Sequence, residues 1–165
     1  MADVKNVYAS VVPVTMTLAS LASDTNLLAG RSSVVVDNSS NKYLDYLVTG
    51  KIVLSGTTPT ASRVVELWCW SMLDASVYFD TIDGTDANKT ITSRDILSSF
   101  MRNVVSFPTP ETASLVIPFG PVSVASLWGG VCPPKFGFWA VQSTAQALNA
   151  AGHIINVQGV YGSAS

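Results

Sequence analysis

The sequence predicts one all-β domain, a jelly-roll-like antiparallel β-sandwich of about eight strands with one or two short helical turns. Short segments rich in β-branched and aromatic residues alternate polar with apolar side chains, which is the period of a half-buried strand. Gly and Pro clusters separate these segments. The length of 165 residues suits a single domain with its own core, and no repeat of 20 to 50 residues indicates a solenoid or propeller.

The expected strands follow one another with little helix between them. The alternation begins at residue 11 and is clearest after Pro13, so residues 1–10 are expected to form an N-terminal arm and residues 11–165 the sandwich domain. The expected strands are residues 11–19, 31–37, 43–54, 64–72, 102–107, 114–118, 136–142 and 154–161.

Two of these strands carry additional local signals. In the strand over residues 43–54, Gly50 is expected to mark a bulge or bend, because glycine inside a strand is unfavourable without such a reason. The strand over residues 64–72 carries Trp68 and Trp70 on one face and Leu67 and Cys69 on the other. Apolar bulk on both faces indicates a strand that is covered on two sides.

The connections contain the few helical signals. Thr92 or Ser93 is expected to cap a short helix over residues 92–97. Residues 123–128 are expected to form a helical turn or loop, and residues 145–148 a helical turn. Residues 74–92 form a long, turn-rich excursion, and loops of this length are usually functional or form interfaces.

Charge is sparse along the whole chain. Charged residues make up 12% of the sequence, against about a quarter in ordinary soluble domains, and the net charge is -2. A surface built from uncharged polar residues costs less to bury than one covered in Lys and Glu, so the composition favours assembly with other proteins. The nine basic residues are scattered singly, which argues against nucleic-acid binding, and no apolar run is long enough to span a membrane.

The sequence contains few residues in patterns that are typical of catalytic sites, and we therefore expect no enzymatic activity. His153 is the only histidine, it begins an expected strand, and no serine or cysteine lies in a recognisable nucleophile motif. Cys69 and Cys132 have no zinc-site spacing, and a disulfide between them is neither required nor excluded by the sequence.

Two groups of residues are candidates for ligand binding. Asp80, Asp83 and Asp86 form an oxygen-rich loop that is a candidate calcium site, although their spacing does not fit an EF-hand, and we expect no cofactor. Trp68 and Trp70 share a strand face and would suit a sugar-stacking platform. We favour a place in the core or in a subunit interface for them, because aromatic residues are enriched in both.

Several stretches are distinctive as a set, namely residues 29–31, 34–38, 43–52, 83–86, 92–94, 118–127, 147–150 and 160–161. In these stretches the sequence resembles a family of small structural proteins encoded by tailed bacteriophages. Members of this family look like virion proteins without a known activity, and the size is similar to that of jelly-roll cement or decoration proteins on the outside of phage heads. No catalytic residues are implied.

This resemblance and the low charge together predict a capsid cement protein. The protein is expected to be made in the host bacterial cytoplasm and to lie on the exterior of the virion capsid. There it is expected to bind across neighbouring subunits of the major capsid protein. We also expect a homo-oligomer, with a trimer favoured. The alternatives are a glycan- or host-binding module on the virion surface and a tail or connector component. The candidate contact residues are Val4, Tyr8, Trp68, Trp70, Tyr78 and Phe79.

Overall fold

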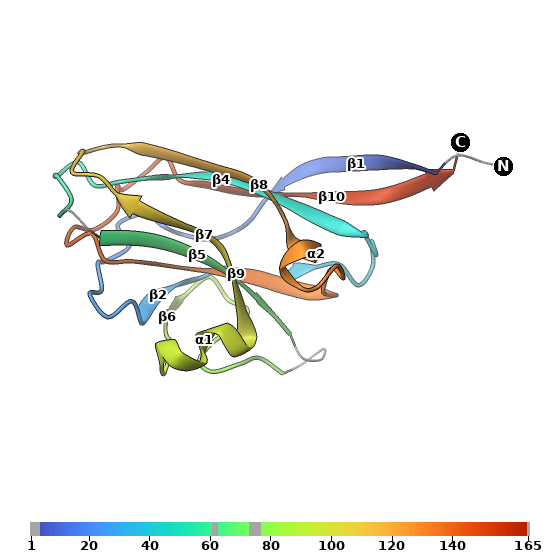
Figure 1. Cartoon of the computed structure of the whole chain (residues 1–165), viewed down its shortest axis with the longest axis horizontal. Helices are drawn as coiled ribbons and strands as arrows, with labels where there is room; N and C mark the ends of the chain where they lie inside the picture. Colours follow the sequence, from blue (N-terminus) through green and yellow to red (C-terminus); the bar gives the residue numbers. More distant parts are fainter. Residues whose placement is uncertain (1–3, 61–62, 73–76, 165) are drawn as a thin grey trace.

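Two antiparallel β-sheets packed face to face form the domain, with two short helices at its periphery (Figure 1). The structure is a computed structural model, and it describes residues 4–60, 63–72 and 77–164. Residues 1–3 of the expected arm and 74–76 of the expected excursion lie outside the described residues. The elements are β1 (Val4–Pro13), β2 (Ala29–Ser32), β3 (Val36–Asp37), β4 (Asp45–Val53), β5 (Arg63–Ser71), β6 (Asn88–Thr90), α1 (Arg94–Phe100), β7 (Met101–Thr109), β8 (Val116–Ser123), α2 (Val124–Leu127), β9 (Lys135–Gln142) and β10 (Ile154–Ala164).

The strand order of the two sheets is that of a jelly roll. One sheet, here called sheet A, has the order β1-β10-β4-β8, and the other, sheet B, has the order β6-β2-β9-β5-β7 with β3 also paired to β9. Without the short strands β3 and β6, each sheet has four strands, and every connection except the one from β5 to β7 crosses between the sheets. This topology confirms the predicted fold class.

The main core lies between the two sheets. It is formed by alternate side chains of the strands, among them Val48 and Ile52 from β4, Leu67 from β5, and Phe136 and Phe138 from β9, all fully buried. The two-residue period of a strand brings these side chains onto one face, and their contact with the opposite sheet removes them from water.

A second core covers the outer face of sheet B. Trp70 and Trp139 point away from the main core and pack with residues of the excursion and of α1, including Ile91 and Phe100. Ser93 caps α1, where its hydroxyl oxygen accepts from the backbone N–H of Asp95. The prediction that the strand over residues 64–72 is covered on two sides is therefore confirmed.

The first strand differs from the sequence prediction. It runs over residues 4–13 instead of 11–19, because β10 continues to Ala164 and pairs with residues 4–8 and 11–13. Beyond this strand the chain leaves sheet A: the carbonyl of Thr15 accepts from the N–H of Val34, next to sheet B. Residues 4–10 of the expected arm are thus the first part of β1.

Two smaller predictions have opposite outcomes. The register between β4 and β8 shifts between Val48 and Gly50, which confirms the bulge expected at Gly50. No helical turn forms over residues 145–148. The Gln142 side chain organises that segment instead, since its amide nitrogen donates to the Gln146 carbonyl and its oxygen accepts from the N–H of Thr144.

Candidate functional site

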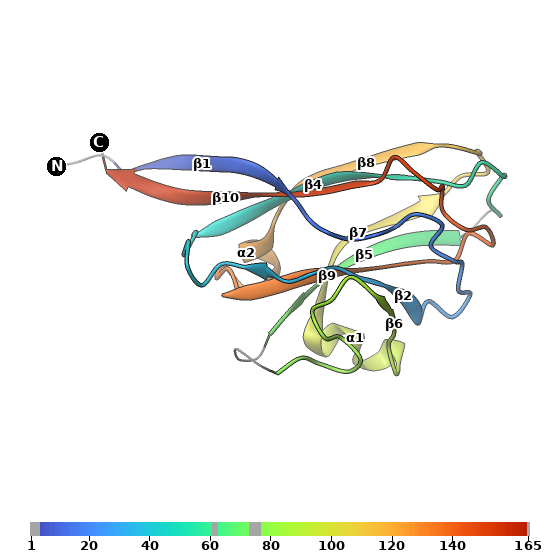
Figure 2. The ribbon, with the colours of Figure 1, turned by 180° about the vertical axis from the view of Figure 1, so that it is seen from behind.

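The most prominent surface feature is a two-stranded ribbon that projects from one end of the sandwich. β1 and β10 continue together beyond the other strands toward the described ends of the chain (Figures 1 and 2). β10 pairs with β4 only as far as Val160, so residues 161–164 pair with β1 alone. A two-stranded ribbon of this kind has little stability of its own and depends on packing against something else.

One face of the ribbon carries exposed apolar side chains along β1. Val4, Tyr8 and Val11 are 76%, 56% and 53% exposed, respectively. They lie opposite Ala164, Val160 and Gln158, which are alternate residues of β10, so all three point to the same face. We call Val4, Tyr8 and Val11 the apolar stripe.

A bulge keeps the stripe in register. The pairing shifts between Tyr8 and Val11, so that β1 holds one residue more than β10 over this stretch. The Gln158 side-chain amide donates to the Ala9 carbonyl at 2.9 Å inside the bulge. Without the extra residue Val11 would point to the opposite face, because successive side chains of a strand alternate.

Tyr43 braces the other face of the ribbon. Its ring stacks on Tyr161 with the ring centroids 5.7 Å apart and lies directly over Gly159. A Cβ atom at residue 159 would lie 2.1 Å from the Tyr43 ring, so this close approach requires glycine. The ribbon is therefore supported on one face and uncovered on the other.

The outer edge of β1 is open, whereas the other sheet edges are blunted. In the described residues β1 pairs only with β10. β8 contains Pro118 and Pro121, β7 contains Pro108, and β6 is three residues long. Proline and short length are common protections of sheet edges against pairing with another chain. β1 has no proline before Pro13.

An apolar groove lies beside this open edge, on the face opposite the stripe. It has a volume of about 260 Å³, and its lining includes Val12, Val34, Val36, Tyr46 and Val157. Val12 is 53% exposed at its mouth. The apolar stripe and the apolar groove thus lie on opposite faces of β1, on either side of its open edge.

Trp68 and Trp70 do not form an exposed platform. Trp70 is 2% exposed in the second core, where its indole N–H donates to the Phe138 carbonyl at 3.1 Å. The Trp68 indole N–H donates to Glu66, and Arg94 lies over the Trp68 ring, 5.5 Å from its centroid. We therefore remove Trp70 from the contact candidates, because its burial leaves nothing for a partner to touch.

Tyr78 and Phe79 are also committed to the second core. The Tyr78 ring contacts the edge of Trp70 at 5.9 Å, and Phe79 stacks on Phe100 at 5.4 Å between centroids. Of the contact residues expected from the sequence, Val4 and Tyr8 are more than half exposed, whereas Trp68, Tyr78 and Phe79 are partly buried against the second core.

The three candidate calcium ligands have separate protein partners. Asp80 accepts from the N–H and the hydroxyl of Thr92, and Asp86 accepts from Arg31 and Thr17. Lys89 and Thr85 donate to Asp83 and lower the pKa of its carboxyl to about 2. The contacts of Asp80 and Asp83 are made within the excursion, and those of Asp86 fasten the excursion to Thr17 and Arg31. Among the described residues, no group of three or more His, Cys, Asp or Glu side chains could hold a metal ion.

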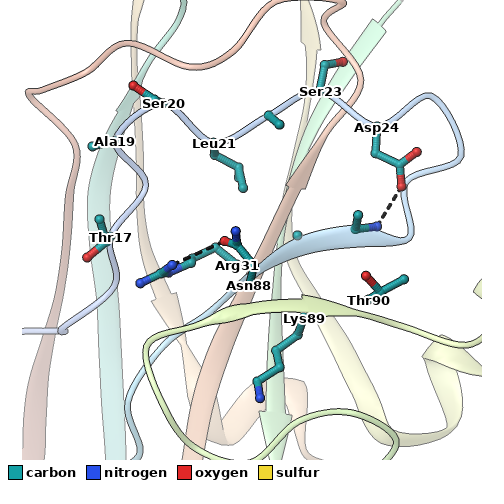
Figure 3. A pocket seen from close by; sticks show the side chains of 13 residues that line it. Thr17, Ala19, Ser20, Leu21, Ser23, Asp24, Arg31, Asn88, Lys89 and Thr90 are labelled. Atoms are coloured by element: carbon teal, nitrogen blue, oxygen red, sulfur yellow. Dashed lines mark hydrogen bonds between the residues drawn. The ribbon is translucent and has the colours of Figure 1, made fainter.

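A polar cavity of about 260 Å³ lies between residues 17–24 and strands β2 and β6 (Figure 3). Asp24 accepts backbone N–H groups from Ala29, Asn26 and Leu28, and the bond from Ala29 contributes most to lowering the pKa of its carboxyl. Arg31 is paired with Asp86 and Asn88. The charged groups here already have partners within the chain, and no aromatic ring lines the cavity.

The remaining residues with catalytic chemistry are held in the framework. His153 accepts from the Val53 N–H through Nδ1, and its Nε2 lies 2.8 Å from the Asn149 carbonyl. Cys69 and Cys132 are both free thiols. Burial raises the pKa of each thiol to about 12, which makes both poor nucleophiles at neutral pH.

Val11 and Val12 were not among the contact residues expected from the sequence, although both lie on the surface around β1. The signal that could have found them is the run of residues 4–13, which holds apolar residues and a single charge, that of Lys5.

Comparisons with known proteins add little. No family model matches the chain, and no curated protein is similar to it. A structure of the infectious bursal disease virus Gx strain is similar over 97% of this chain and 32% of that chain, with 10% identity and a TM-score of 0.36. A structure of T=1 particles derived from infectious bursal virus is similar over 98% of this chain and 39% of that chain, with 12% identity and a TM-score of 0.33. The chain spans less than two fifths of the length of either, and at these TM-scores the likeness carries no argument about function. No helix in the described residues is long and apolar enough to cross a membrane.

Proposed function

We propose that the protein is a non-catalytic structural component of a virus particle, which contacts neighbouring protein subunits through the β1–β10 ribbon. The apolar stripe carries this proposal. Val4, Tyr8 and Val11 are each more than half exposed on a strand face that no segment among residues 4–60, 63–72 and 77–164 covers. Asn6 lies on the same face between Val4 and Tyr8, and exposed apolar side chains gathered on one strand face suit a protein–protein contact.

Two further features support a place in a virus particle. The jelly roll is a common fold of viral capsid domains, although lectin domains share it. The motifs over residues 43–52 and 118–127 also led us to expect a small structural protein of a tailed bacteriophage. The more specific role that we propose is that of a cement or decoration protein, bound on the outside of a phage head across subunits of the major capsid protein. A protein that binds only the assembled lattice stabilises that lattice by its binding free energy.

The alternative roles receive less support from the site. The sugar-stacking platform predicted for a glycan-binding module does not form, because Trp70 is buried and the ring of Trp68 lies under Arg94. A tail or connector component would use the same apolar ribbon in a different place on the particle. A density map of the intact particle separates head from tail, and a glycan array tests sugar binding.

The stripe can be tested on particles from which the protein has been removed. Val4→Lys with Tyr8→Lys should lower the rebinding of the protein at least tenfold, because each lysine places a charge where the contact would bury it. Val116→Lys is the matched control, since Val116 is 47% exposed on β8, at the far edge of the same sheet, and should leave rebinding unchanged. Normal occupancy by the folded stripe variant would contradict the proposal.

A further inference from the structure

The open edge of β1 has a regular pattern of free backbone groups. The N–H of Val14 donates to the Ile155 carbonyl, which fixes the side of β10 that faces β1. Because backbone groups alternate along a strand, residues 155, 157, 159, 161 and 163 point toward β1. Their partners in β1 include Lys5, Val7 and Val12, which therefore bond to β10.

The remaining residues of β1 direct their backbone groups outward. These are Val4, Asn6 and Tyr8 before the bulge and Val11 and Pro13 after it. The residues whose backbone groups point outward have even numbers before the bulge and odd numbers after it, because the bulge inserts one residue. Pro13, which has no N–H, falls on the open edge, where the missing donor costs no bond to β10.

This change makes the edge complementary to itself. If Tyr8 lies opposite Val11 of a second copy running antiparallel, Val11 lies opposite Tyr8 of that copy, and Asn6 and Pro13 likewise face each other. All of these residues have outward backbone groups. Each Tyr8–Val11 pair can exchange two hydrogen bonds, and each Asn6–Pro13 pair can form one.

The side chains agree with the same register. On one face, Tyr8 and Val11 of the two copies meet and join the two apolar stripes into one patch. On the other face, Val7 of the second copy lies beside Val12, at the mouth of the apolar groove. Lys5, the only charged residue of β1, lies opposite Val14 of the second copy, so no like charges face each other.

We propose that two copies of this chain associate through β1, edge to edge and antiparallel, so that their two A sheets become one continuous sheet. Among the described edge strands, β1 has the longest stretch free of proline, because Pro13 is its last residue, whereas Pro108 interrupts β7 earlier, β8 contains Pro118 and Pro121, and β6 is short. The pairing leaves the joined stripes open on the outer face. It is thus compatible with the proposed contact to a particle but does not depend on it.

The register can be tested by charge exchange, with sedimentation equilibrium as the readout. The unmodified protein should be a dimer. The double variant Tyr8→Glu with Val11→Glu places like charges directly opposite each other and should be monomeric, as should Tyr8→Lys with Val11→Lys. An equimolar mixture of the two variants pairs Glu with Lys and should form a dimer of one copy of each.

The control is Val116→Glu with Ile154→Glu, which adds the same charge at exposed positions outside β1 and should remain dimeric. Far-UV circular dichroism of each variant before sedimentation verifies that it is folded. A monomeric or trimeric unmodified protein would overturn the proposal, as would a mixture of the folded variants that stays monomeric. The particle role is tested separately by rebinding of the Val4→Lys variant alone, because Val4 lies outside the paired segment.

Discussion

Apolar side chains lie outside the main core in two regions, the outer face of sheet B and the ribbon of sheet A. On sheet B the excursion and α1 cover these side chains, whereas no described segment covers those on the ribbon. Trp70, Trp139 and Phe100 are buried in the second core. Val4 and Tyr8 on the ribbon are more than half exposed. Apolar residues outside the main core therefore serve folding in one region and remain available for contact in the other.

The largest effect is expected from a cavity in the second core. Phe100→Ala removes a buried ring that stacks on Phe79 and should lower the free energy of unfolding by about 3–5 kcal/mol. Urea denaturation followed by tryptophan fluorescence measures the loss. A loss below about 1 kcal/mol would mean that the excursion contributes little to the fold.

A smaller loss should follow when the ion pair beneath the excursion is broken. Arg94 binds the buried carboxylate of Glu66 through two contacts of 2.7 and 3.1 Å. Arg94→Met keeps much of the packing but leaves the Glu66 carboxylate without its cation. The free energy of unfolding should fall by about 2 kcal/mol, which is less than for a fully buried pair because Arg94 is one third exposed. Lys135→Met removes a more exposed pair with Asp37 at 3.4 Å and should lower the free energy of unfolding less in the same denaturation measurement. Equal losses for the two variants would show that the Arg94–Glu66 pair contributes no more than an exposed pair.

Acid should weaken the attachment of the excursion before it affects the ribbon. The folded pKa of Asp83 is about 2, and that of Asp86 is also lowered, since its bonds from Arg31 and Thr17 outweigh the effect of its burial. Both carboxylates therefore stabilise the fold at neutral pH, and this contribution is lost as the pH falls from about 4 toward 2. Urea midpoints between pH 7 and pH 2 should fall less steeply for Asp83→Asn than for the unmodified protein, and parallel curves would contradict this assignment.

The smallest effect on stability is expected on the ribbon. Tyr8→Ser removes an exposed ring and should change the free energy of unfolding by less than about 0.5 kcal/mol in dilute solution. Its effect should appear in association instead, as a shift of the monomer–dimer equilibrium toward monomer. A large loss of stability in dilute monomer would show that Tyr8 serves the fold of its own chain.

Local signals predicted the fold class and several elements, because strand alternation, the Ser93 cap and the bulge at Gly50 depend on residues near each other in the chain. The start of β1 could not be predicted in this way. It depends on β10, which is about 150 residues away and offers pairing partners as far as Ala164.

The candidate site was only partly predictable for a similar reason. Trp70 and Tyr8 are both aromatic residues on strands, and their own sequence does not distinguish them. Trp70 is buried because the excursion and α1 fold back over its face, whereas no described segment folds over Tyr8. The open edge of β1 likewise depends on the order of strands in the sheet.

Amide hydrogen exchange along β1 tests most directly whether this strand is the contact edge. In dilute monomer, the amides of Lys5, Val7 and Val12 should be protected by β10, and those of Asn6, Tyr8 and Val11 should exchange rapidly. At concentrations where the protein associates, these three outward amides should become protected as well. Outward amides that exchange equally fast in both states would contradict the account.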